Sequence, residues 1–374
     1  MANEEMMTDL DGWMESSSST NVPRALRAAD RNHYLGRENR RGIQYSNYLI
    51  IGRSLGMARR QPLTTPRSRM AFLISVTVLA LLTAGASAAV SSERDHEEGS
   101  QAVVFSLDVA GTHQFRAKVT RGGDVSVTRI ALAVDVSGPA VEEMTVGFGL
   151  SYTGDDYGFS ALRGFSVARP WRYVHRIGLN GRVVYPIGKS WSLSAVPTVQ
   201  LSAESGADWS RAFGCGAVVS TSYRPNPGFM IGLGVAAFKQ IERTSVFPIP
   251  LLSVKLSDRW RIGNSFRSGG PTPAGFEVVY KVNKDWEATG AVGYRSSRFR
   301  LNRHGPVCNG IGQDRSVPVG MRFSRALARR GSLDLYGGIA FSGSLRVEDK
   351  RGRKIDEAGY RPAPYGGISL RAAF

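Results

Sequence analysis

Apolar and polar residues alternate along most of the chain after Gln101. Between Ser190 and Ser202, every second residue from Trp191 to Leu201 is apolar, and the residues between them are mostly polar. The segment Ser332–Leu345 repeats the pattern. Alternation over ten or more residues predicts a β-strand with one apolar face and one wet face.

The same pattern predicts a series of strands without a helix of useful length between them. Many exceed the five or six residues usual in globular sheets. They fit a tilted strand that crosses hydrocarbon in about 9–11 residues. The predicted strands cover residues 102–120 (at least the second half), 124–136, 142–153, 172–185, 190–202, 210–223, 228–241, 246–256, 259–268, 274–282, 286–298, 315–326, 332–345 and 363–374.

Tight and long connections are segregated along these strands. A soluble periplasmic β-sandwich, the alternative fold, has no reason to separate them, whereas an outer-membrane barrel has short periplasmic turns and longer outer loops. We therefore predict an all-β fold, a single antiparallel transmembrane β-barrel of about 12–14 strands over residues 101–374. The tight links are Leu327–Gly331, Asn283–Asp285, Leu256–Asp258, Arg224–Pro227 and Pro186–Lys189, and the long links are Arg346–Pro362, Phe299–Asp314 and Thr153–Trp171.

A hydrophobic segment, Met70–Val90, precedes the alternating region. Two arginines stand just before an apolar run that closes on Ala86-Ser87-Ala88, which is the three-part pattern of a secretory signal peptide. The run is nearer a dozen residues than the roughly 20 that a membrane-spanning helix needs. We therefore favour a signal peptide over residues 70–88, cleaved between Ala88 and Ala89, rather than a membrane anchor.

The segments on either side of this signal carry no strand pattern. Residues 1–69 are polar and irregular, and we interpret them as disordered or as an extension outside the translated protein. Residues 89–100 form a charged leader that we expect to be mobile. Export by the signal and a barrel downstream together predict the outer membrane of a bacterium with two membranes.

Basic side chains outnumber acidic ones by 48 to 31, and residues 89–374 keep 37 and 24 of them. Such an excess favours anionic surfaces, here lipopolysaccharide and phospholipid head groups. An exported protein rarely meets nucleic acid, so we expect no nucleic-acid partner. Cys215 and Cys308 both fall in the exported part, where a disulfide is allowed. Neither has a CxxC or metal-ligand spacing, and the sequence leaves their pairing open.

Aromatic residues stand at strand ends beside the tight turns. Three segments place a polar turn just before a tryptophan, at Trp191, Trp260 and Trp286. Amphipathic rings are favoured at a membrane–water boundary, and a position at strand ends argues against a soluble core. The predicted aromatic girdle comprises Tyr185, Trp191, Trp260, Tyr280, Trp286 and Phe374, and Tyr152, Tyr173 and Tyr294 are candidates for the opposite boundary.

The last alternating strand ends on Phe374. A terminal Phe in such a strand resembles the signal by which bacterial outer-membrane barrels are recognised by their assembly machinery, although Ala372 stands where the commonest form has an aromatic residue. We therefore expect the C-terminal strand to engage that machinery.

From about Gln101 to Phe374 the chain resembles a family of bacterial outer-membrane β-barrels of unassigned function. The residues that carry the resemblance are Phe247-Pro-Ile-Pro-Leu-Leu252, the following turn tryptophan Trp260, then Tyr280 with Trp286, and Gly293-Tyr294-Arg295. The resemblance implies a fold and a location. It transfers no functional residue.

Charged side chains fall on the strand face opposite the aromatic residues. Because an arginine on the lipid face costs about 2–4 kcal/mol near the midplane, we expect them to point into the lumen. An arginine excess there predicts a general or anion-preferring pore. The alternative is a non-conducting structural or adhesin-like barrel filled by ion pairs. The predicted lumen residues are Arg176, Arg182, Arg259, Arg261, Arg267, Glu277, Glu287, Arg295, Arg322, Asp334 and Arg371.

An outer-membrane enzyme is the least favoured function. The histidines His113, His175 and His304 show no metal-ligand or nucleophile spacing, and the sequence contains no Gly-x-Ser-x-Gly elbow with plausible partners. A rim Ser–His set cannot be assembled from the sequence alone. We expect no catalytic residue, metal or cofactor.

Two charged loops leave a binding function open. Asp155-Asp156 could bind a divalent cation, although paired acids in turns are usually just solvated. The basic segment Arg346–Arg353 could contact lipopolysaccharide or a surface ligand, although mixed charge in a loop usually serves solubility.

Overall fold

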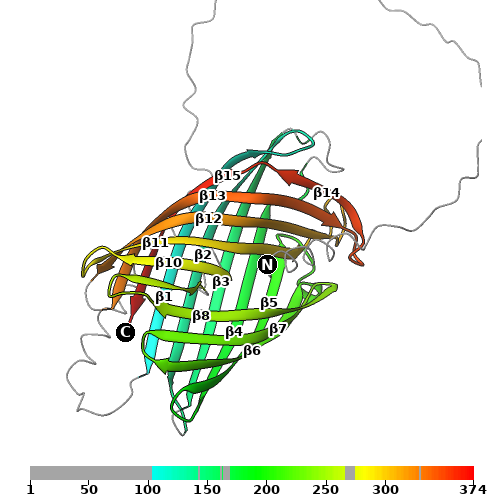
Figure 1. The fold of residues 1–374 in the computed structure, drawn as a ribbon. Helices are drawn as coiled ribbons and strands as arrows, with labels where there is room; N and C mark the ends of the chain where they lie inside the picture. The colour runs from blue at the N-terminus through cyan, green and yellow to red at the C-terminus, as the bar shows by residue number, and fades with distance from the viewer. Residues whose placement is uncertain (1–102, 142–143, 161, 163–168, 266–273, 328–329) are drawn as a thin grey trace, which may run out of the picture. The chain divides into compact units, whose positions relative to one another are not determined.

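The computed structural model describes residues 103–374 except 142–143, 161, 163–168, 266–273 and 328–329. The expected signal peptide, with Ala86, Ala88 and Ala89, lies outside the described residues. Figure 1 shows an antiparallel β-barrel. Its elements are β1 (Val104–Lys118), β2 (Asp124–Pro139), β3 (Thr145–Ser160), β4 (Tyr173–Ile187), β5 (Trp191–Glu204), the 3-10 helix η1 (Trp209–Arg211), β6 (Phe213–Asn226), β7 (Phe229–Gln240), β8 (Arg243–Lys255), β9 (Trp260–Ser265), β10 (Ala274–Lys281), β11 (Trp286–Arg300), β12 (Ile311–Leu327), β13 (Gly331–Glu348), β14 (Lys354–Tyr360) and β15 (Ala363–Ala373).

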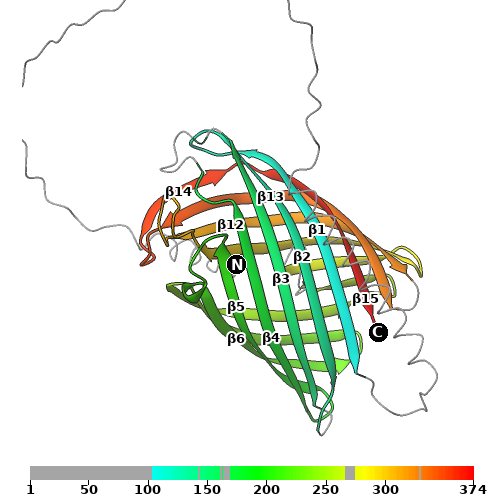
Figure 2. The ribbon, with the colours of Figure 1, turned by 180° about the vertical axis from the view of Figure 1, so that it is seen from behind.

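The barrel is a closed ring of 14 strands. Each strand from β1 to β13 pairs with the next, and β15 pairs with both β13 and β1 (Figure 2). Strand β13 pairs with β15 over Gly331–Ala340 and with β14 over Gly343–Glu348. Strands β14 and β15 are therefore two halves of one broken strand, and the ring has the largest strand number that the sequence predicted.

The period-two pattern sorts side chains onto two faces. Leu150 in β3 and Leu179 in β4 pair across the ladder and are 56% and 53% exposed on the outside. Asp155, on the opposite face of β3, is 3% exposed. Exposed apolar residues thus cover the outer face and charged ones fill the inner face, the arrangement of a barrel surrounded by lipid.

All long connections emerge at one end of the barrel, which we call the loop end. At the other end, the turn end, no connection exceeds five residues. Gly188 has a φ of 63° in the β4–β5 turn, a left-handed conformation that glycine adopts at no steric cost. No helix among the described residues is long and apolar enough to cross a membrane.

Several strands extend into segments that the sequence predicted as loops. Strand β3 continues to Ser160, β12 starts at Ile311 and β14 lies inside the predicted loop Arg346–Pro362. In that loop, Asp349–Arg353 is only the turn of a hairpin. The prediction failed because the loop-end halves of these strands carry charged residues on both faces, which hides the alternation, while pairing with neighbouring strands still forms the ladder.

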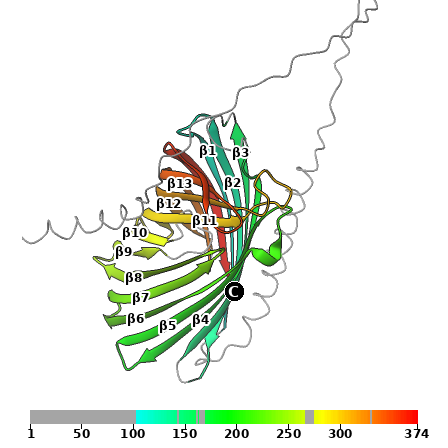
Figure 3. The ribbon, with the colours of Figure 1, turned by 90° about the vertical axis from the view of Figure 1, so that its right-hand side faces the viewer.

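The barrel narrows at the loop end. Arg300 of β11 forms a parallel bridge with Ala203 of β5, six strands away around the ring. Strands β1–β4, β11 and β13–β15 there enclose an apolar core, the loop-end core. Figure 3 shows β6 to β10 as successive neighbouring strands of the barrel wall. Trp171 stands edge-on to Phe299 of β11 with ring centroids 5.2 Å apart. The interior at this end is filled by side chains.

Candidate functional site

A cavity of about 200 Å³ lies inside the barrel next to the loop-end core. In β2 and β4 a lining residue stands two positions after a core residue, on the same inner face: Arg129 follows Val127, and Arg176 follows Val174. We call this cavity the arginine chamber. It is lined by Ala110, Thr112, Arg129, Ala131, Thr153, Asp155, Arg176, Gln200, Gln240, Arg295, Ser296, Ser297, Arg298, Pro318 and Tyr365.

The boundary between the chamber and the core is built around Asp314 of β12. This carboxylate is fully buried and accepts hydrogen bonds from the hydroxyls of Tyr157 and Tyr360, both at 3.0 Å. The guanidinium of Arg129 donates to it at 3.2 Å. Strands β2, β3 and β14 are thereby tied to β12. A buried carboxylate with a charged partner and two hydroxyl donors is a well-compensated arrangement.

Asp155 of β3 lies between the guanidinium groups of Arg129 in β2 and Arg176 in β4, on one wall of the chamber. Its carboxylate oxygens lie 3.6 Å from Arg129 Nε and 3.6 Å from Arg176 Nη2. The guanidinium of Arg176 also donates to the hydroxyl of Ser297 in β11. Side chains therefore reach from one wall of the barrel to the opposite one.

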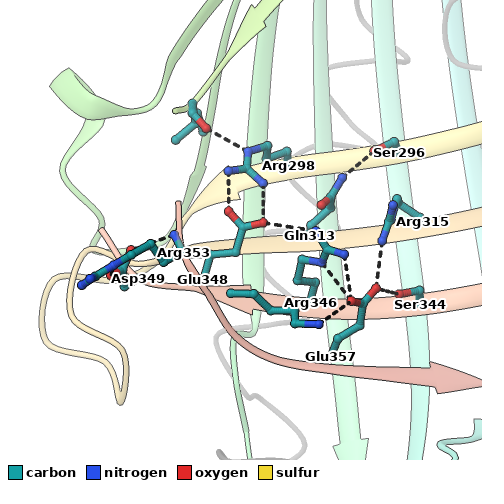
Figure 4. A network of polar contacts seen from close by, with 12 residues as sticks. Ser296, Arg298, Gln313, Arg315, Ser344, Arg346, Glu348, Asp349, Arg353 and Glu357 are labelled. Carbon is teal, nitrogen blue, oxygen red and sulfur yellow. Dashed lines mark hydrogen bonds and ion pairs between the residues drawn. The ribbon is translucent and has the colours of Figure 1, made fainter. Parts of the chain in front are cut away.

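Strand β11 contributes arginines from both of its faces. Arg295 donates to Gln114 at 3.1 Å and to Ser316 at 3.0 Å. Arg298, on the other face, forms a bidentate pair with Glu348, in which Nη1 donates to Oε1 at 3.0 Å, and its Nε donates to the Ile241 carbonyl at 2.8 Å (Figure 4). The second contact ties β11 to the β7–β8 turn.

The chamber has more cationic than anionic groups. Four arginines line it, and Asp155 is the carboxylate among the residues that do. Two further carboxylates outside the lining partly neutralise these arginines: Asp314 pairs with Arg129, and Glu348 pairs with Arg298. Two buried donors, Nη1 of Arg129 and Nε of Arg295, have no hydrogen-bond partner among the described residues. Buried donors are nearly always satisfied in folded proteins, so a water or an anion held beside these two atoms would complete their hydrogen bonds.

A second, smaller cavity next to the chamber is lined in part by an aromatic ring. This cavity of about 50 Å³ shares Gln200, Gln240 and Arg298 with the chamber and reaches Phe238 of β7. The Phe238 ring stacks with that of Phe247 at 6.2 Å. A Cβ at Gly216 would lie 2.2 Å from the Phe238 ring, so glycine at this position lets the ring lie against the wall.

The structure brings some of the eleven predicted lumen residues into the chamber and places others elsewhere. Arg176 and Arg295 line the chamber. The others with inward contacts lie nearer the turn end, where Glu277 pairs with Arg322 at 3.2 Å, Arg371 pairs with Asp108 at 2.7 Å, and Asp334 accepts from the Ser369 hydroxyl at 3.1 Å.

The remaining predicted lumen residues within the described strands are placed by strand register. By register, Arg182 lies opposite Gly147, Arg261 opposite Val279 and Glu287 opposite Ser324, all on the inner face. Arg259 lies in the β8–β9 turn and not in a strand. Arg267 lies outside the described residues.

The predicted girdle residues gather at the turn end. Trp260 packs on Tyr280 with centroids 4.6 Å apart, and Phe374 lies 6.1 Å from Phe105. Trp191, Trp260 and Trp286 are each between 40% and 49% exposed. Tyr185 is 44% exposed on the same outer face. Outward-facing aromatic rings at one end of the barrel are what an interfacial belt requires, and the belt itself stays a prediction.

Sequence reasoning missed Arg129, Arg298 and Asp314. Arg129 lies in a strand with apolar residues on both faces, because Ile130 and Val134 outside match Val127 and Ala131 inside, so the phase of the strand cannot be read. Asp314 was assigned to a loop, because the predicted strand began one residue later. The sequence still gave one indication of this site. Arg129 lies in an otherwise apolar strand, where a charged side chain is costly unless it points into the barrel and is paired there.

Cys215 and Cys308 are both free thiols. No group of three or more His, Cys, Asp or Glu side chains among the described residues is placed to hold a metal ion.

A polar array on the outer face escaped the sequence analysis as well. His175 Nε2 lies 2.9 Å from the hydroxyl of Ser205, and His175 Nδ1 lies 2.9 Å from the hydroxyl of Tyr152. The rings of Tyr152 and Trp209 flank the imidazole, with centroids 6.2 and 6.5 Å away. The three hydrogen-bonded residues come from β3, β4 and the segment after β5, and only the folded barrel brings them together.

The family described as Domain of unknown function (DUF6268) matches residues 172–371, which is more than half of the chain. The chain belongs to this family. The matched residues include β4 to β14 and most of β15. This region contributes Arg176, Arg295 and Arg298 to the chamber lining and Asp314 to its boundary, while Arg129 and Asp155 come from strands before it. A search of curated proteins found no match.

Solved structures with a similar arrangement include bacterial outer-membrane proteins of different kinds. An outer-membrane channel from Pseudomonas putida F1 is 9% identical with a TM-score of 0.41, over 74% of this chain and 97% of that one. A FadL homologue from Pseudomonas aeruginosa is 11% identical with a TM-score of 0.39, over 73% and 89%. The translocator domain of the autotransporter NalP from Neisseria meningitidis is 12% identical with a TM-score of 0.32, over 80% and 98%. Similarity at this level carries no functional argument.

Proposed function

We propose that this protein is an outer-membrane channel that admits small anionic solutes through the arginine chamber. The observation that carries the proposal is the pair of buried guanidinium donors, on Arg129 and Arg295, that lack hydrogen-bond partners among the described residues beside a cavity of about 200 Å³. The apolar outer face and the expected signal peptide support a location in the outer membrane.

An anion in the chamber would find arginines that are only partly neutralised. Arg176 and Arg295 stand 3.6 and 3.9 Å from their nearest carboxylates, Asp155 and Asp314. These separations exceed a charge-assisted hydrogen bond of about 2.7–2.9 Å. A carboxylate or phosphate on a solute could therefore take up guanidinium hydrogen bonds without breaking a short ion pair. The rings of Phe238 and Phe247 nearby favour organic over inorganic anions.

Passage beyond the chamber requires side chains to move. The loop-end core and the β5–β11 bridge fill the interior between the chamber and the loop end. We therefore expect a small unitary conductance with rare openings, in contrast to the steady current of a wide porin.

Single-channel recording with the refolded barrel in planar bilayers tests the proposal. Under a potassium chloride gradient, the reversal potential should show chloride preference, and benzoate should reduce the chloride current by competing for the arginines. The double variant Arg176→Gln with Arg295→Gln should lose that preference. Arg259→Gln, in an exposed turn, is the matched control and should retain it. Cation preference in the unmodified protein would overturn the proposal.

A non-conducting structural barrel is the second candidate, because the loop-end core fills the interior like the core of a soluble protein. In that case neither the unmodified protein nor variants that shorten the interior side chains should pass current, and proteoliposomes should not swell in solutions of small anions.

A further inference from the structure

We propose that Ser205, His175 and Tyr152 form a hydrolytic site for the acyl esters of membrane lipids, on the outer face of the barrel at the loop end. The site is separate from the arginine chamber, and this activity goes beyond the proposed transport function. Sequence reasoning found no rim Ser–His set because the two residues stand 30 positions apart on different elements.

The three side chains have the mutual geometry of a nucleophile, a base and an orienting group. With a proton on Nδ1, His175 donates to the Tyr152 oxygen at 2.9 Å, and its Nε2 accepts the Ser205 hydroxyl proton at 2.9 Å. A serine bonded to a histidine whose other nitrogen is held by a third group is the arrangement that activates serine for acyl transfer. The contact with the Tyr152 oxygen holds the imidazole in one orientation.

The backbone around Ser205 is fixed from several directions. The Ser205 N–H donates to the Tyr173 carbonyl at 2.8 Å, and the Asn302 side-chain amide donates to the Ser205 carbonyl at 2.8 Å. Gly206 follows with a φ of 82°, a sharp turn that glycine adopts at no steric cost. A nucleophile on a rigid turn keeps its orientation when substrate binds. The N–H of Gly206, the residue directly after the nucleophile, is our candidate donor for a developing oxyanion.

The side chains around Ser205 and His175 suit a lipid ester as the substrate. His175 shares the outer face of β4 with Ile177 and Leu179, which are 41% and 53% exposed. These side chains continue toward the turn end as part of the apolar belt, so an acyl chain could lie along them. Ester carbonyls sit where acyl chains meet head groups, which is the level of a rim site. The guanidinium of Arg172 lies over the Tyr173 ring at 4.7 Å and offers a charge for a lipid phosphate.

The reaction balances without a co-reactant other than water. Ser205 Oγ bonds to the ester carbonyl carbon as its proton passes to His175 Nε2. The bond from that carbon to the alkoxy oxygen then breaks, and the same proton goes to the leaving alkoxide, which departs as an alcohol. Water, deprotonated by His175, attacks the acyl-serine and releases a fatty acid and free Ser205.

The test uses the full barrel folded in detergent micelles and a fluorophosphonate probe, which forms an adduct only with activated serines. We expect one labelled residue, Ser205, and hydrolysis of p-nitrophenyl octanoate about 10²–10⁴-fold above that of Ser205→Ala. His175→Gln should abolish both signals. Tyr152→Phe should lower kcat with little effect on KM, because it removes the orienting group and leaves the surface intact.

Two controls separate chemistry from folding. Ser210→Ala removes a hydroxyl from η1, five residues after the nucleophile, and should label and hydrolyse like the unmodified protein. All variants should keep the heat-dependent gel mobility of a folded barrel. Vesicles of phosphatidylethanolamine and, separately, purified lipopolysaccharide then show which lipid releases fatty acid. The absence of an adduct on Ser205, or equal hydrolysis by the unmodified protein and Ser205→Ala, overturns the proposal.

Discussion

Arg176 of β4 donates a hydrogen bond to Ser297 of β11 from the opposite side of the barrel. In a ring of 14 strands the two strands are seven steps apart in either direction, so this contact crosses the full width of the interior. A hydrogen bond at this place divides the lumen and fixes the distance between its walls.

Loss of this cross-lumen contact should open the interior. We expect Arg176→Ala and Ser297→Ala each to raise the unitary conductance in planar bilayers, because each removes the bridge. Only Arg176→Ala should also reduce anion preference, since Ser297→Ala leaves the guanidinium in place. Equal selectivity in the two variants would show that Arg176 does not set the preference.

Replacement of Asp314 by Asn should destabilise the barrel strongly. The change removes the closer of the two carboxylates that face the buried guanidinium of Arg129 and leaves it only the longer contact to Asp155 at 3.6 Å. Removal of one member of a buried pair costs about 3–5 kcal/mol. Urea titration of the folded barrel in lipid vesicles measures the free energy of unfolding. Asp124→Asn, in a half-exposed position near the loop end, is the matched control and should cost less than about 1 kcal/mol.

The turn-end tryptophans should report a membrane boundary. In variants that retain one tryptophan each, brominated lipids should quench Trp191, Trp260 and Trp286 strongly, because these rings face outward. Trp171, 2% exposed in the loop-end core, should be quenched little. Strong quenching of Trp171 together with weak quenching of the other three would place the barrel differently in the bilayer.

The stability of the β13–β14 hairpin turn should depend on the charge of Asp349. The pKa of this carboxyl lies below its ordinary value of 3.8 because the Arg353 N–H and then the Arg353 guanidinium donate to it. A lowered pKa means that the charged form is the one favoured by the fold. Its contribution is complete above the ordinary pKa and is lost as the pH falls through the lowered one.

At neutral pH, Asp349→Asn should therefore speed hydrogen exchange at Arg351 and Arg353, whose amides donate to this carboxylate at 2.9 Å. Peptide-level exchange measured by mass spectrometry detects the change. Asp258→Asn, at the β8–β9 turn, should leave exchange in the hairpin unchanged. Equal exchange in Asp349→Asn and the unmodified protein would show that water replaces the carboxylate without loss.

The barrel could be predicted from the sequence because the patterns that indicate it are local to each hairpin. Alternation at Trp191–Leu201 and the tight turns need no knowledge of distant strands, since each hairpin is built from neighbours in the chain. The same reasoning placed Arg176 and Arg295 on the inner face. Strand β14 was missed because Lys354–Tyr360 carries charges on both faces, and only its pairing with β13 makes it a strand.

The chamber could not be assembled from the sequence, because its geometry depends on which strands stand opposite one another. Nothing local to Asp314 indicates that Tyr157 approaches from β3, 157 positions earlier. The narrowing of the ring between Ala203 and Arg300 is likewise a property of the closed barrel. The same holds for Ser205 and His175, whose contact requires the segment after β5 to fold over the outer face.

The pairing of β1 with β15 has a consequence for how the molecule is made. Consecutive strands meet their partners across connections of a dozen residues or fewer, whereas Phe105 exchanges backbone hydrogen bonds with Phe374, the last residue of the chain. Contacts so distant in sequence form slowly, because the whole intervening chain must first be ordered. Until β15 pairs with β1, the sheet has two bare edges, which invite aggregation. A barrel that lost β15 would therefore remain an open sheet with an unpaired edge along β1.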